Sequence, residues 1–487
     1  MRKPVSCVIT IFLSLVLLMI SSLIFTLLES ARSEGLRLRT KLAVQAATES
    51  AFAMYDKPLW DECGVLAYVD QYGDAKEMER QTLLYARKNA GSDWLSPAFD
   101  KTSIDCFVGA TDANGDAYIK MLASNMTRLG LVQMALDKAA STKGVDIGSL
   151  DDIGGNADGE ISFDNIKDKI DSVATEMENA REKADVRQDA ESGSIEASGG
   201  GESITWQGNT QDEDEDENRK KYDDLLEDFS NLKKKGLLML VLDDVEGISE
   251  AEYDNTDFPS QLSDEVKERC EAKGLKASSL ERILAKEYYM QNFDSYTSSD
   301  KKSFELEYLL CGKSSDLANI SSAVKRLVGI RMVIDYLKTR SDAKRISEAL
   351  AIATAVVGWT CIPSLVTATK EVILIIWALK DAISDVRKLA DGNKVSLMND
   401  GKLMLSYTDY LRVLLCFADD RDLSYRAMDI MQMKIRRKEP AFLMKRGIIY
   451  AKITLYASSS AMFPYLPGLI NYDIRQTVEF SYIDMNQ

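Results

Sequence analysis

The sequence predicts a mainly α-helical protein with a smaller β part, an α+β fold, and a transmembrane helix at its N-terminus. Residues 5–28 carry no charged side chain. Apolar residues recur at helical spacing through most of the chain after residue 222. Alternation with a period of two occurs near the end, in GIIYAKITLY and YDIRQTVEFSYI, whose Tyr, Ile, Thr and Val content suits antiparallel strands.

The apolar segment 5–28 is predicted to be an uncleaved signal anchor in contact with membrane lipid. Its residues rise about 1.5 Å each, which is enough to cross a hydrocarbon core of roughly 30 Å. A secretory signal has a shorter apolar core, of about 7–15 residues, and ends in a small-residue cleavage pattern that is missing here. Positive charges flank the segment on both sides, but the short N-terminal tail and the large C-terminal part favour an extracytoplasmic body and a single crossing of the cell membrane.

The helix is predicted to continue beyond the membrane over residues 29–55, because this stretch has no Pro and only one Gly. One face carries mostly small residues at spacings of three and four, namely Thr40, Ala43, Ala47, Ser50 and Met54. Such a stripe lets another helix approach closely. The partner is either another helix of the same chain or a neighbouring subunit in a filament or complex.

Residues 75–184 are predicted to form several helices, and two fragments there resemble the start of a calcium loop. DANGD places oxygen ligands at Asp112, Asn114 and Asp116, and GNADGEISFDN does so at Asn156 and Asp158. Each fragment lacks part of the calcium-loop pattern, so both are interpreted as Asx-rich turns. No metal site is predicted.

The composition changes sharply after residue 184, where ESGSIEASGGGES is a flexible tract and QDEDEDENRKK is a run of charges. The predicted parts of the chain are a cytoplasmic tail and transmembrane anchor (1–28), a helical stalk and N-terminal extracytoplasmic region (29–184), an acidic Gly/Ser-rich disordered linker (185–222) and a C-terminal α+β domain (223–487).

Several elements are predicted within the C-terminal domain. SDLANISSAVKRLVGIRMVIDYL is expected to be a core helix that Ser315 or Asp316 caps. Residues 349–369 are uncharged, and they form either a second membrane span or a buried helical hairpin; Gly358 and Pro363 favour the hairpin. The turn sequence at 399–401 predicts a small β-hairpin. TDYLRVLLCF and LSYRAMDIMQMKIRRK return to helical spacing.

The amino-acid composition excludes several classes of function. A net charge of −17 excludes a nucleic-acid partner, which requires clustered Lys and Arg. The chain has no His, which removes the usual general base of hydrolases and a common zinc ligand. Its seven cysteines are scattered and are interpreted as individual buried thiols rather than as disulfides or a metal site. No catalytic, cofactor-binding or metal-binding residue is predicted, and the protein is expected not to be an enzyme.

The chain resembles a family of uncharacterised Gram-positive (clostridial-type) membrane proteins whose genes tend to lie among those of tight-adherence (Flp/Tad) pilus or secretion systems. The shared pieces are VITIFLSLVLL and LLESAR at the membrane, SAFAMYDKPLWDECGVLAYVD after it, then GLLMLVLDD, FELEYLLCGKSSDLANI, LVGIRMVIDYL, IIWALKDAISDVRKLADGNKVSL and LSYTDYLRVLLCF. They cover residues 5–72 and most of 230–435.

The N-terminal part of the chain is similar to TadE/TadG-type pseudopilins, in which an apolar helix anchors an outward-facing domain. It departs from a pilin processing site, because Cys7 stands where relatives often have Gly and the first acid is Glu29. The resemblance implies a structural or accessory component of a pilus or secretion apparatus that contacts protein partners through helix 29–55. The alternative is a cell-surface binding module that captures a protein or an envelope polymer through the loop MFPYLPGL.

The resemblance also singles out polar residues whose expected role is ion pairing and helix capping rather than catalysis. In the first group, Glu305 and Glu307 fall on different faces of a helix. In the second, Asp381 and Asp385 form a like-charged pair that Arg387 or Lys380 could neutralise. The remaining members are Tyr308, Gly312, Lys313, Asp316 and Trp377.

Overall fold

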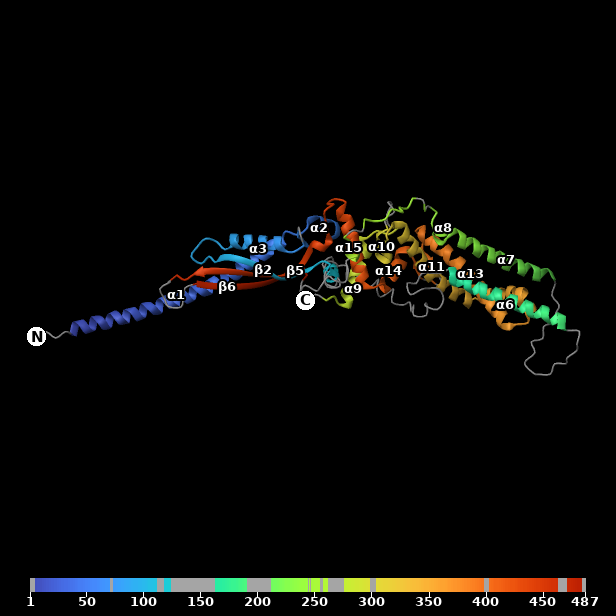
Figure 1. Ribbon diagram of the computed structural model, residues 1–487, viewed down its shortest axis with the longest axis horizontal. Helices are drawn as coiled ribbons and strands as arrows, with labels where there is room; N and C mark the ends of the chain where they lie inside the picture. The colour runs from blue at the N-terminus through green and yellow to red at the C-terminus, as the bar shows by residue number, and fades with distance from the viewer. Residues whose placement is uncertain are drawn as a thin grey trace, which may run out of the picture. The chain divides into compact units, whose positions relative to one another are not determined.

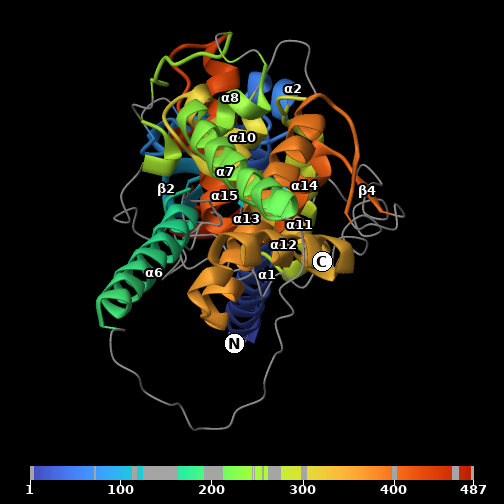
Figure 2. The ribbon, with the colours of Figure 1, turned by 90° about the vertical axis from the view of Figure 1, so that its right-hand side faces the viewer.

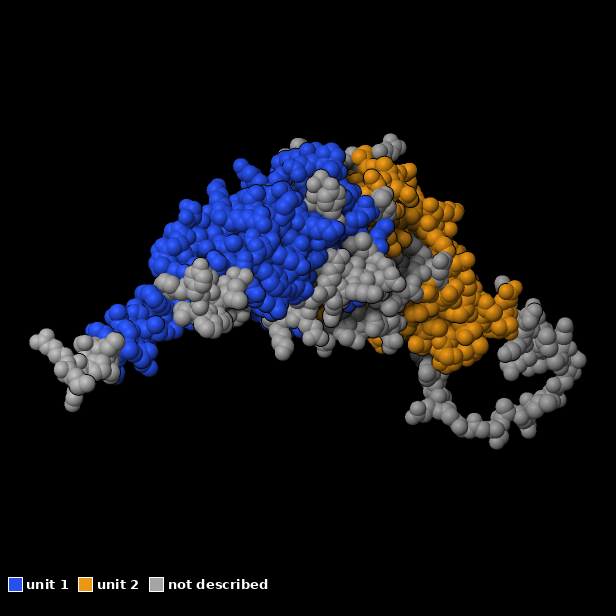
Figure 3. Space-filling view, turned by 60° about the vertical axis from the view of Figure 1, so that its left-hand side comes forward, with its two compact units in different colours: residues 1–136, 255–292, 419–487 blue, residues 137–254, 293–418 orange. Residues whose placement is uncertain are grey.

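The computed structural model describes residues 5–70, 73–111, 118–123, 163–190, 212–243, 245, 247–254, 257–261, 276–297, 304–397, 403–462 and 471–483. The chain divides into two compact units (Figure 3). Unit 1 comprises Met1–Leu136, Asn255–Asn292 and Asp419–Gln487, and unit 2 comprises Asp137–Asp254 and Phe293–Ala418. Each unit combines segments that are far apart in the sequence.

Unit 1 contains a long N-terminal helix, an antiparallel sheet and shorter helices. The helices are α1 (Val5–Phe52), α2 (Lys57–Cys63), α3 (Lys76–Asn89), α9 (Ser279–Asn292) and α15 (Asp420–Arg436), with 3₁₀ turns η2 (Pro259–Gln261) and η4 (Met444–Arg446). The strands are β1 (Tyr68–Val69), β2 (Ala98–Gly109), β5 (Gly447–Ser460) and β6 (Asn471–Ser481).

Helix α1 is a single element of 48 residues that combines the predicted anchor with the predicted stalk. Among the described helices it alone is long and apolar enough to cross a membrane, and none of its most apolar window is buried in the protein. Its first half stands out from unit 1, and its second half lies beside α3 and β6 (Figure 1). The predicted continuation of the helix is confirmed as far as Phe52.

Strand β5 is central in the sheet of unit 1, with antiparallel partners on both of its edges. β2 pairs with it along one edge and β6 along the other, and the short β1 pairs with its first two residues. The predicted antiparallel strands near the end of the chain are therefore confirmed as β5 and β6. Strand β2 corrects the expectation of helices through 75–184: its Thr102, Ile104, Cys106 and Val108 alternate as in a strand, and pairing with β5 gives its backbone groups their partners along one edge.

The core of unit 1 lies between this sheet and the helices α1 and α3. Ala43, Val44 and Ala47 of α1 meet Ala451 and Ile453 of β5 in one buried cluster. The small side chains allow the helix to lie close to the sheet. The predicted stripe on α1 thus packs within the same chain at Thr40, Ala43 and Ala47, whereas Met54 is exposed and lies past the end of the helix.

Unit 2 is a bundle of helices with one small hairpin. Its helices are α6 (Phe163–Ala190), α7 (Asp212–Lys235), α8 (Leu237–Val241), α10 (Glu305–Cys311), α11 (Asp316–Ser341), α12 (Ala343–Val357), η3 (Gly358–Thr360), α13 (Pro363–Ala390) and α14 (Tyr407–Phe417). The hairpin pairs β3 (Val395–Ser396) with β4 (Met404–Leu405), as predicted. Ser315 caps α11, where its hydroxyl accepts the backbone N–H of Ala318 at 3.3 Å.

Residues 349–369 belong to a helical hairpin made of α12 and α13, which pack on each other. Gly358 ends α12 and Pro363 opens α13, the positions at which these residues are tolerated. Ala349, Ile352 and Leu365 are fully buried in unit 2. The hairpin interpretation of this apolar segment is therefore confirmed.

The range 185–222 contains more helix than a disordered linker would have. α6 extends to Ala190 and α7 begins at Asp212, while 191–211 lie outside the described residues. The acidic run opens α7 and three lysines close it, which suits the helix dipole. Tyr222, Leu225 and Phe229 recur at helical spacing and are buried, and α7 contacts α12 and α13 (Figure 2).

The cysteines do not all behave as buried thiols. Cys63 and Cys311 are buried thiols, as predicted, but Cys361 and Cys416 are exposed. Cys106 is disulfide-bonded, which corrects the expectation of scattered thiols. The first calcium-like fragment, the turn at 399–401 and most of the loop MFPYLPGL lie outside the described residues, and so does the second calcium-like fragment up to the start of α6.

Candidate functional site

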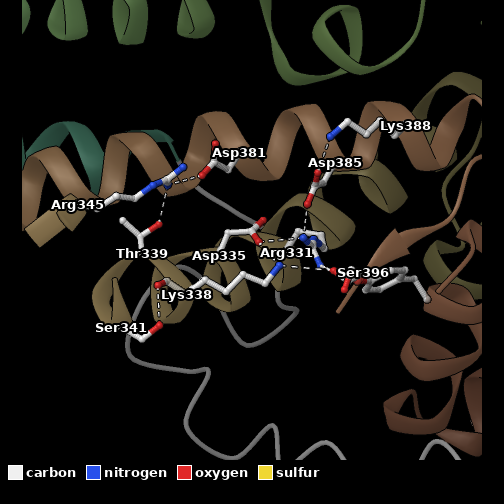
Figure 4. Close-up of polar contacts among 11 residues, drawn as sticks. Arg331, Asp335, Lys338, Thr339, Ser341, Arg345, Asp381, Asp385, Lys388 and Ser396 are labelled. Carbon is white, nitrogen blue, oxygen red and sulfur yellow. Dashed lines mark hydrogen bonds and ion pairs between the residues drawn. The ribbon is translucent and has the colours of Figure 1, made fainter. Parts of the chain in front are cut away.

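A network of charged side chains in unit 2 joins several of its helices. Its centre is Arg331 of α11, whose side chain is fully buried. The guanidinium donates to the carboxylate of Asp335 at 2.9 Å and to that of Asp385 on α13 (Figure 4). It also donates to the Tyr410 hydroxyl at 3.0 Å and to the backbone carbonyl of Ser396 at 3.1 Å. One side chain therefore joins α11, α13, α14 and strand β3.

A second ion pair extends the network along the same helices. Arg345 of α12 donates to Asp381 of α13 at 2.6 Å and to the Thr339 hydroxyl of α11 at 3.1 Å (Figure 4). Lys338 lies 2.9 Å from Asp335, and Lys388 lies 3.0 Å from Asp385. A polar cavity of about 260 Å³ lies among these groups, lined by Asp335, Lys338, Thr339, Asp342, Arg345, Asp381, Ser384, Asp385 and Lys388.

The acidic and basic side chains around this cavity neutralise each other's charge. Asp335, Asp381 and Asp385 each contact at least one cation, so none of them stands ready as a general base. Burial acts to lower the pKa of Arg331, but Tyr410 and Asp335 outweigh it and raise that pKa. The described residues contain no group of three or more His, Cys, Asp or Glu that could hold a metal ion. The arrangement suits a clamp between helices.

The sequence singled out Asp381 and Asp385 of this clamp but not Asp335, and it assigned the two acids the wrong cations. Arg387 pairs with Asp243, and Lys380 pairs with Asp228, so neither serves Asp381 or Asp385. Arg331 was missed because it stands inside the apolar run LVGIRMVIDYL. Its signal was an arginine on an apolar helix with an acid four residues later. Trp377 lines a second cavity, of about 350 Å³, together with Arg345, Glu348, Lys380 and Asp381.

Glu305 and Glu307 of α10 lie in different surroundings, as their spacing predicted. Glu305 accepts the backbone N–H of Asp294 at 3.1 Å. Glu307 is fully buried and accepts the Tyr407 hydroxyl at 2.7 Å and the backbone N–H of Tyr296 at 3.1 Å. Burial raises the pKa of Glu307 to about 7. Both side chains hold the segment before α10 in place by capping its backbone, the role expected of them.

The other residues singled out around α10 and α11 belong to one small cluster. Gly312 ends α10 in the left-handed conformation, with a φ of 62°, which favours glycine. Asp316 accepts the Tyr253 hydroxyl at 2.5 Å, and the ring of Tyr253 meets that of Tyr308 edge to face. The backbone N–H of Lys313 donates to Asn319 at 2.7 Å. These contacts tie the segment at Tyr253 to the start of α11.

A separate polar site lies in unit 1, at the point where α1 ceases to be apolar. Glu29 and Arg32 are only 1% and 8% exposed and lie 3.3 Å apart. The guanidinium of Arg32 donates to the Ser460 carbonyl at 2.9 Å and to the Trp94 carbonyl at 3.2 Å. Glu29 accepts the backbone N–H of Met462 at 3.2 Å. This pair, the boundary clamp, binds the loop before β2 and the end of β5 to one turn of α1.

Two further contacts hold the loop before β2 against α1. Arg39 forms an ion pair with Asp93 at 2.6 Å, two turns beyond Arg32. Gly35 lies between Arg32 and Arg39 on α1. A Cβ at this position would lie 3.2 Å from the side chain of Leu95, so glycine allows the loop to approach the helix closely. Tyr472 of β6 also hydrogen-bonds Glu29; burial and this bond raise the pKa of Tyr472. The sequence did not predict these contacts, since their partners are up to 433 positions apart.

The sequence profile of a family of unknown function, DUF5702, matches residues 215–404 and 399–459, which together span half of the chain. Comparisons with curated proteins and with solved structures found no significant match. The matched region includes the charged clamp of unit 2 and strand β5, and it does not include α1.

Replacing Arg331 with Met is expected to destabilise unit 2 strongly, because it leaves Asp335 and Asp385 without their shared buried partner. The expected loss is about 3–5 kcal/mol of unfolding free energy, measured by urea denaturation of the detergent-solubilised chain. The matched control is Arg387→Met, which removes an exposed pair and is expected to cost about 1 kcal/mol or less. Equal losses for both variants would contradict the role given to Arg331.

Replacing Glu307 with Gln is expected to remove part of the pH dependence of stability. Its pKa is 4.5 in the unfolded chain and about 7 in the folded one, so the unfolded state ionises first as the pH rises. The stability that the protonated Glu307 contributes is present below pH 4.5 and is lost by about pH 7. The loss is at most about 3 kcal/mol.

Urea denaturation between pH 4.5 and 8 measures this difference. Glu305→Gln is the matched control for the loss of a carboxylate that caps the backbone before α10, because Glu305 lies on the same helix and is only partly buried. A Glu307→Gln variant with an unchanged slope would show that the buried carboxyl does not titrate in this window.

Proposed function

Because the chain belongs to a family of unknown function (DUF5702), which brings no activity with it, we propose a function from the chain's own features. The protein is a single-pass membrane protein with an extracytoplasmic body. It serves as a structural, non-catalytic accessory component of a Tad-type pilus or secretion apparatus. Its mechanism is anchoring through α1 and side-by-side packing of this helix with protein partners.

The continuity of α1 carries the proposal. Its first half presents apolar side chains on all sides, and its second half is part of the core of unit 1. No hinge residue separates the two halves, since the helix from Val5 to Phe52 has no Pro and is hydrogen-bonded throughout. A force on the body would therefore pass directly into the anchor. This is the arrangement implied by the resemblance to TadE/TadG-type pseudopilins.

The disulfide at Cys106 supports the extracytoplasmic placement of the body. Disulfides persist in oxidising compartments and are rare in the cytosol, where thiols are kept reduced. Cys106 lies in β2, in the sheet onto which α1 packs. Its bond would therefore form on the side of the membrane that holds unit 1.

The exposed side of α1 beyond the anchor supports packing against partners. Leu38 and Leu42 are exposed one helical turn apart, opposite the small residues that face the sheet. They lie beyond the exposed ion pair of Glu34 and Arg37 and form a small apolar patch on the stalk. A second helix that packs along α1 would bury both leucines, which contributes about 1.5–3 kcal/mol for each one fully covered.

The sidedness of the body can be tested with the native thiol of Cys361, which is exposed in unit 2. In intact cells that express a Cys416→Ser variant, a membrane-impermeant maleimide should label Cys361. Cys63 and Cys311 are buried and should react only after denaturation. Cys361→Ser in the same background is the control and should abolish the labelling. Labelling that requires cell lysis would place the body in the cytoplasm and overturn the proposed function.

The packing of α1 with partners can be tested by a double substitution, Leu38→Glu and Leu42→Glu. Native electrophoresis of solubilised membranes should show the unaltered protein in a large complex and the double variant released from it. Leu84→Glu is the control, because Leu84 is an exposed apolar residue on α3 and should not affect the complex. A double variant that stays in the complex, or a native protein that migrates alone, would contradict assembly through α1.

A further inference from the structure

Two exposed apolar side chains of unit 1 are fixed to the turn of α1 that follows the anchor. Trp94 is 62% exposed and Met462 is 54% exposed. Their backbones bind Arg32 and Glu29 of the boundary clamp, so the two residues lie at the level of this turn although they come from distant segments.

The height of this turn places both residues at the membrane surface if α1 spans the bilayer. Leu28 is the last residue of the uncharged stretch. Glu29 and Arg32 follow it by about 1.5 Å and about 6 Å along the helix axis. The headgroup layer on each side of a bilayer is roughly 5–7 Å thick. The backbones of Trp94 and Met462 are thus held within this layer.

The charges at this level are turned inward, which suits contact with lipid. Glu29 and Arg32 are buried by each other and by the backbone of the two segments, so their charges do not face the hydrocarbon. At the same level unit 1 exposes an indole and a thioether. Tryptophan prefers this layer, because its ring is apolar while its N–H can bond to water or headgroups.

We infer that Trp94 and Met462 form a lipid-binding seat, by which unit 1 rests in the interfacial layer of the bilayer that α1 crosses. The inference rests on the proposed membrane insertion of α1 and adds a second contact with lipid. Together with α1 the seat gives three points of contact, so the body cannot swing freely about the helix. Tilt and rotation of the anchor are then fixed by the protein itself.

The seat has no preference for anionic lipids. The nearest cations along α1 are paired, Arg37 with Glu34 and Arg39 with Asp93. Binding therefore depends on the transfer of apolar surface and is insensitive to salt. This separates the seat from a basic patch that recognises acidic headgroups.

Bromine-labelled lipids test the seat, because bromine quenches tryptophan fluorescence only at short range. One variant keeps Trp94 alone, with Phe at positions 60, 206, 359 and 377, and a matched variant keeps Trp60 alone. Trp60 is partly exposed in unit 1 but follows the far end of α1. The end of α1 lies 24 residues after Leu28, which corresponds to about 36 Å along the helix axis. Trp60 follows that end and is therefore far from the bilayer.

In phosphatidylcholine vesicles brominated close to the headgroup, the fluorescence of Trp94 should fall about twofold, as expected for an indole in the interfacial layer. The fluorescence of Trp60 should not change. Added anionic lipid or salt should leave both results unaltered. Circular dichroism and resistance to alkaline carbonate extraction establish that each variant is folded and inserted.

The outcomes separate the seat from the anchor. Quenching of Trp94 and not of Trp60 in an inserted protein supports the seat. An inserted protein in which Trp94 is quenched no more than Trp60 overturns the seat and leaves the anchor intact. A protein that carbonate extracts from the vesicles overturns both. Quenching that requires anionic lipid would assign the contact to headgroup charge and overturn the apolar seat.

Discussion

Unit 1 depends on one helix, α1, whose two halves have different surroundings. The first half of α1 must be apolar on every side to suit hydrocarbon, whereas its second half must be amphipathic to meet a sheet on one side only. The change occurs within one turn, at Glu29 and Arg32. Both charges are satisfied there by the protein rather than by water, through bonds to each other, to Ser460 and to Met462. With the proposed insertion of α1, the position of the sheet relative to the bilayer would follow from those few bonds.

Unit 2 solves a different problem, since its helices are held together partly by buried charge. A guanidinium as deeply buried as that of Arg331 loses its hydration, and its bonds to Asp335, Asp385, Tyr410 and Ser396 offset this cost. Apolar side chains of similar volume in place of the whole network, the two carboxylates included, would be about as stable, whereas removing Arg331 alone leaves both carboxylates without their buried partner. What the charges add is register: a helix shifted by one turn would leave a carboxylate or the guanidinium without a partner.

Local patterns predicted the helices well, because periodicity and capping are local signals. Ser315, Gly358 and Pro363 stand where helix chemistry needs them, and the sequence predicted those boundaries. The sequence could not reveal which distant groups meet. Strand β2 was missed because its pairing partner lies near the other end of the chain, and Arg331 was missed because its ligands come from several elements. The acidic run of α7 shows no helical periodicity of apolar residues, because the buried face of this helix begins only at Tyr222.

The central position of β5 in the sheet has a consequence for the order in which the chain folds. β2 leaves the ribosome more than three hundred residues before β5, a delay on the order of half a minute at usual rates of synthesis. Until then α1 lacks the cover that β5 and β6 give to its inward face. All of unit 2 has been made by residue 418, so it can fold while unit 1 is still incomplete. The part of the chain that is synthesised first is therefore the part that is completed last.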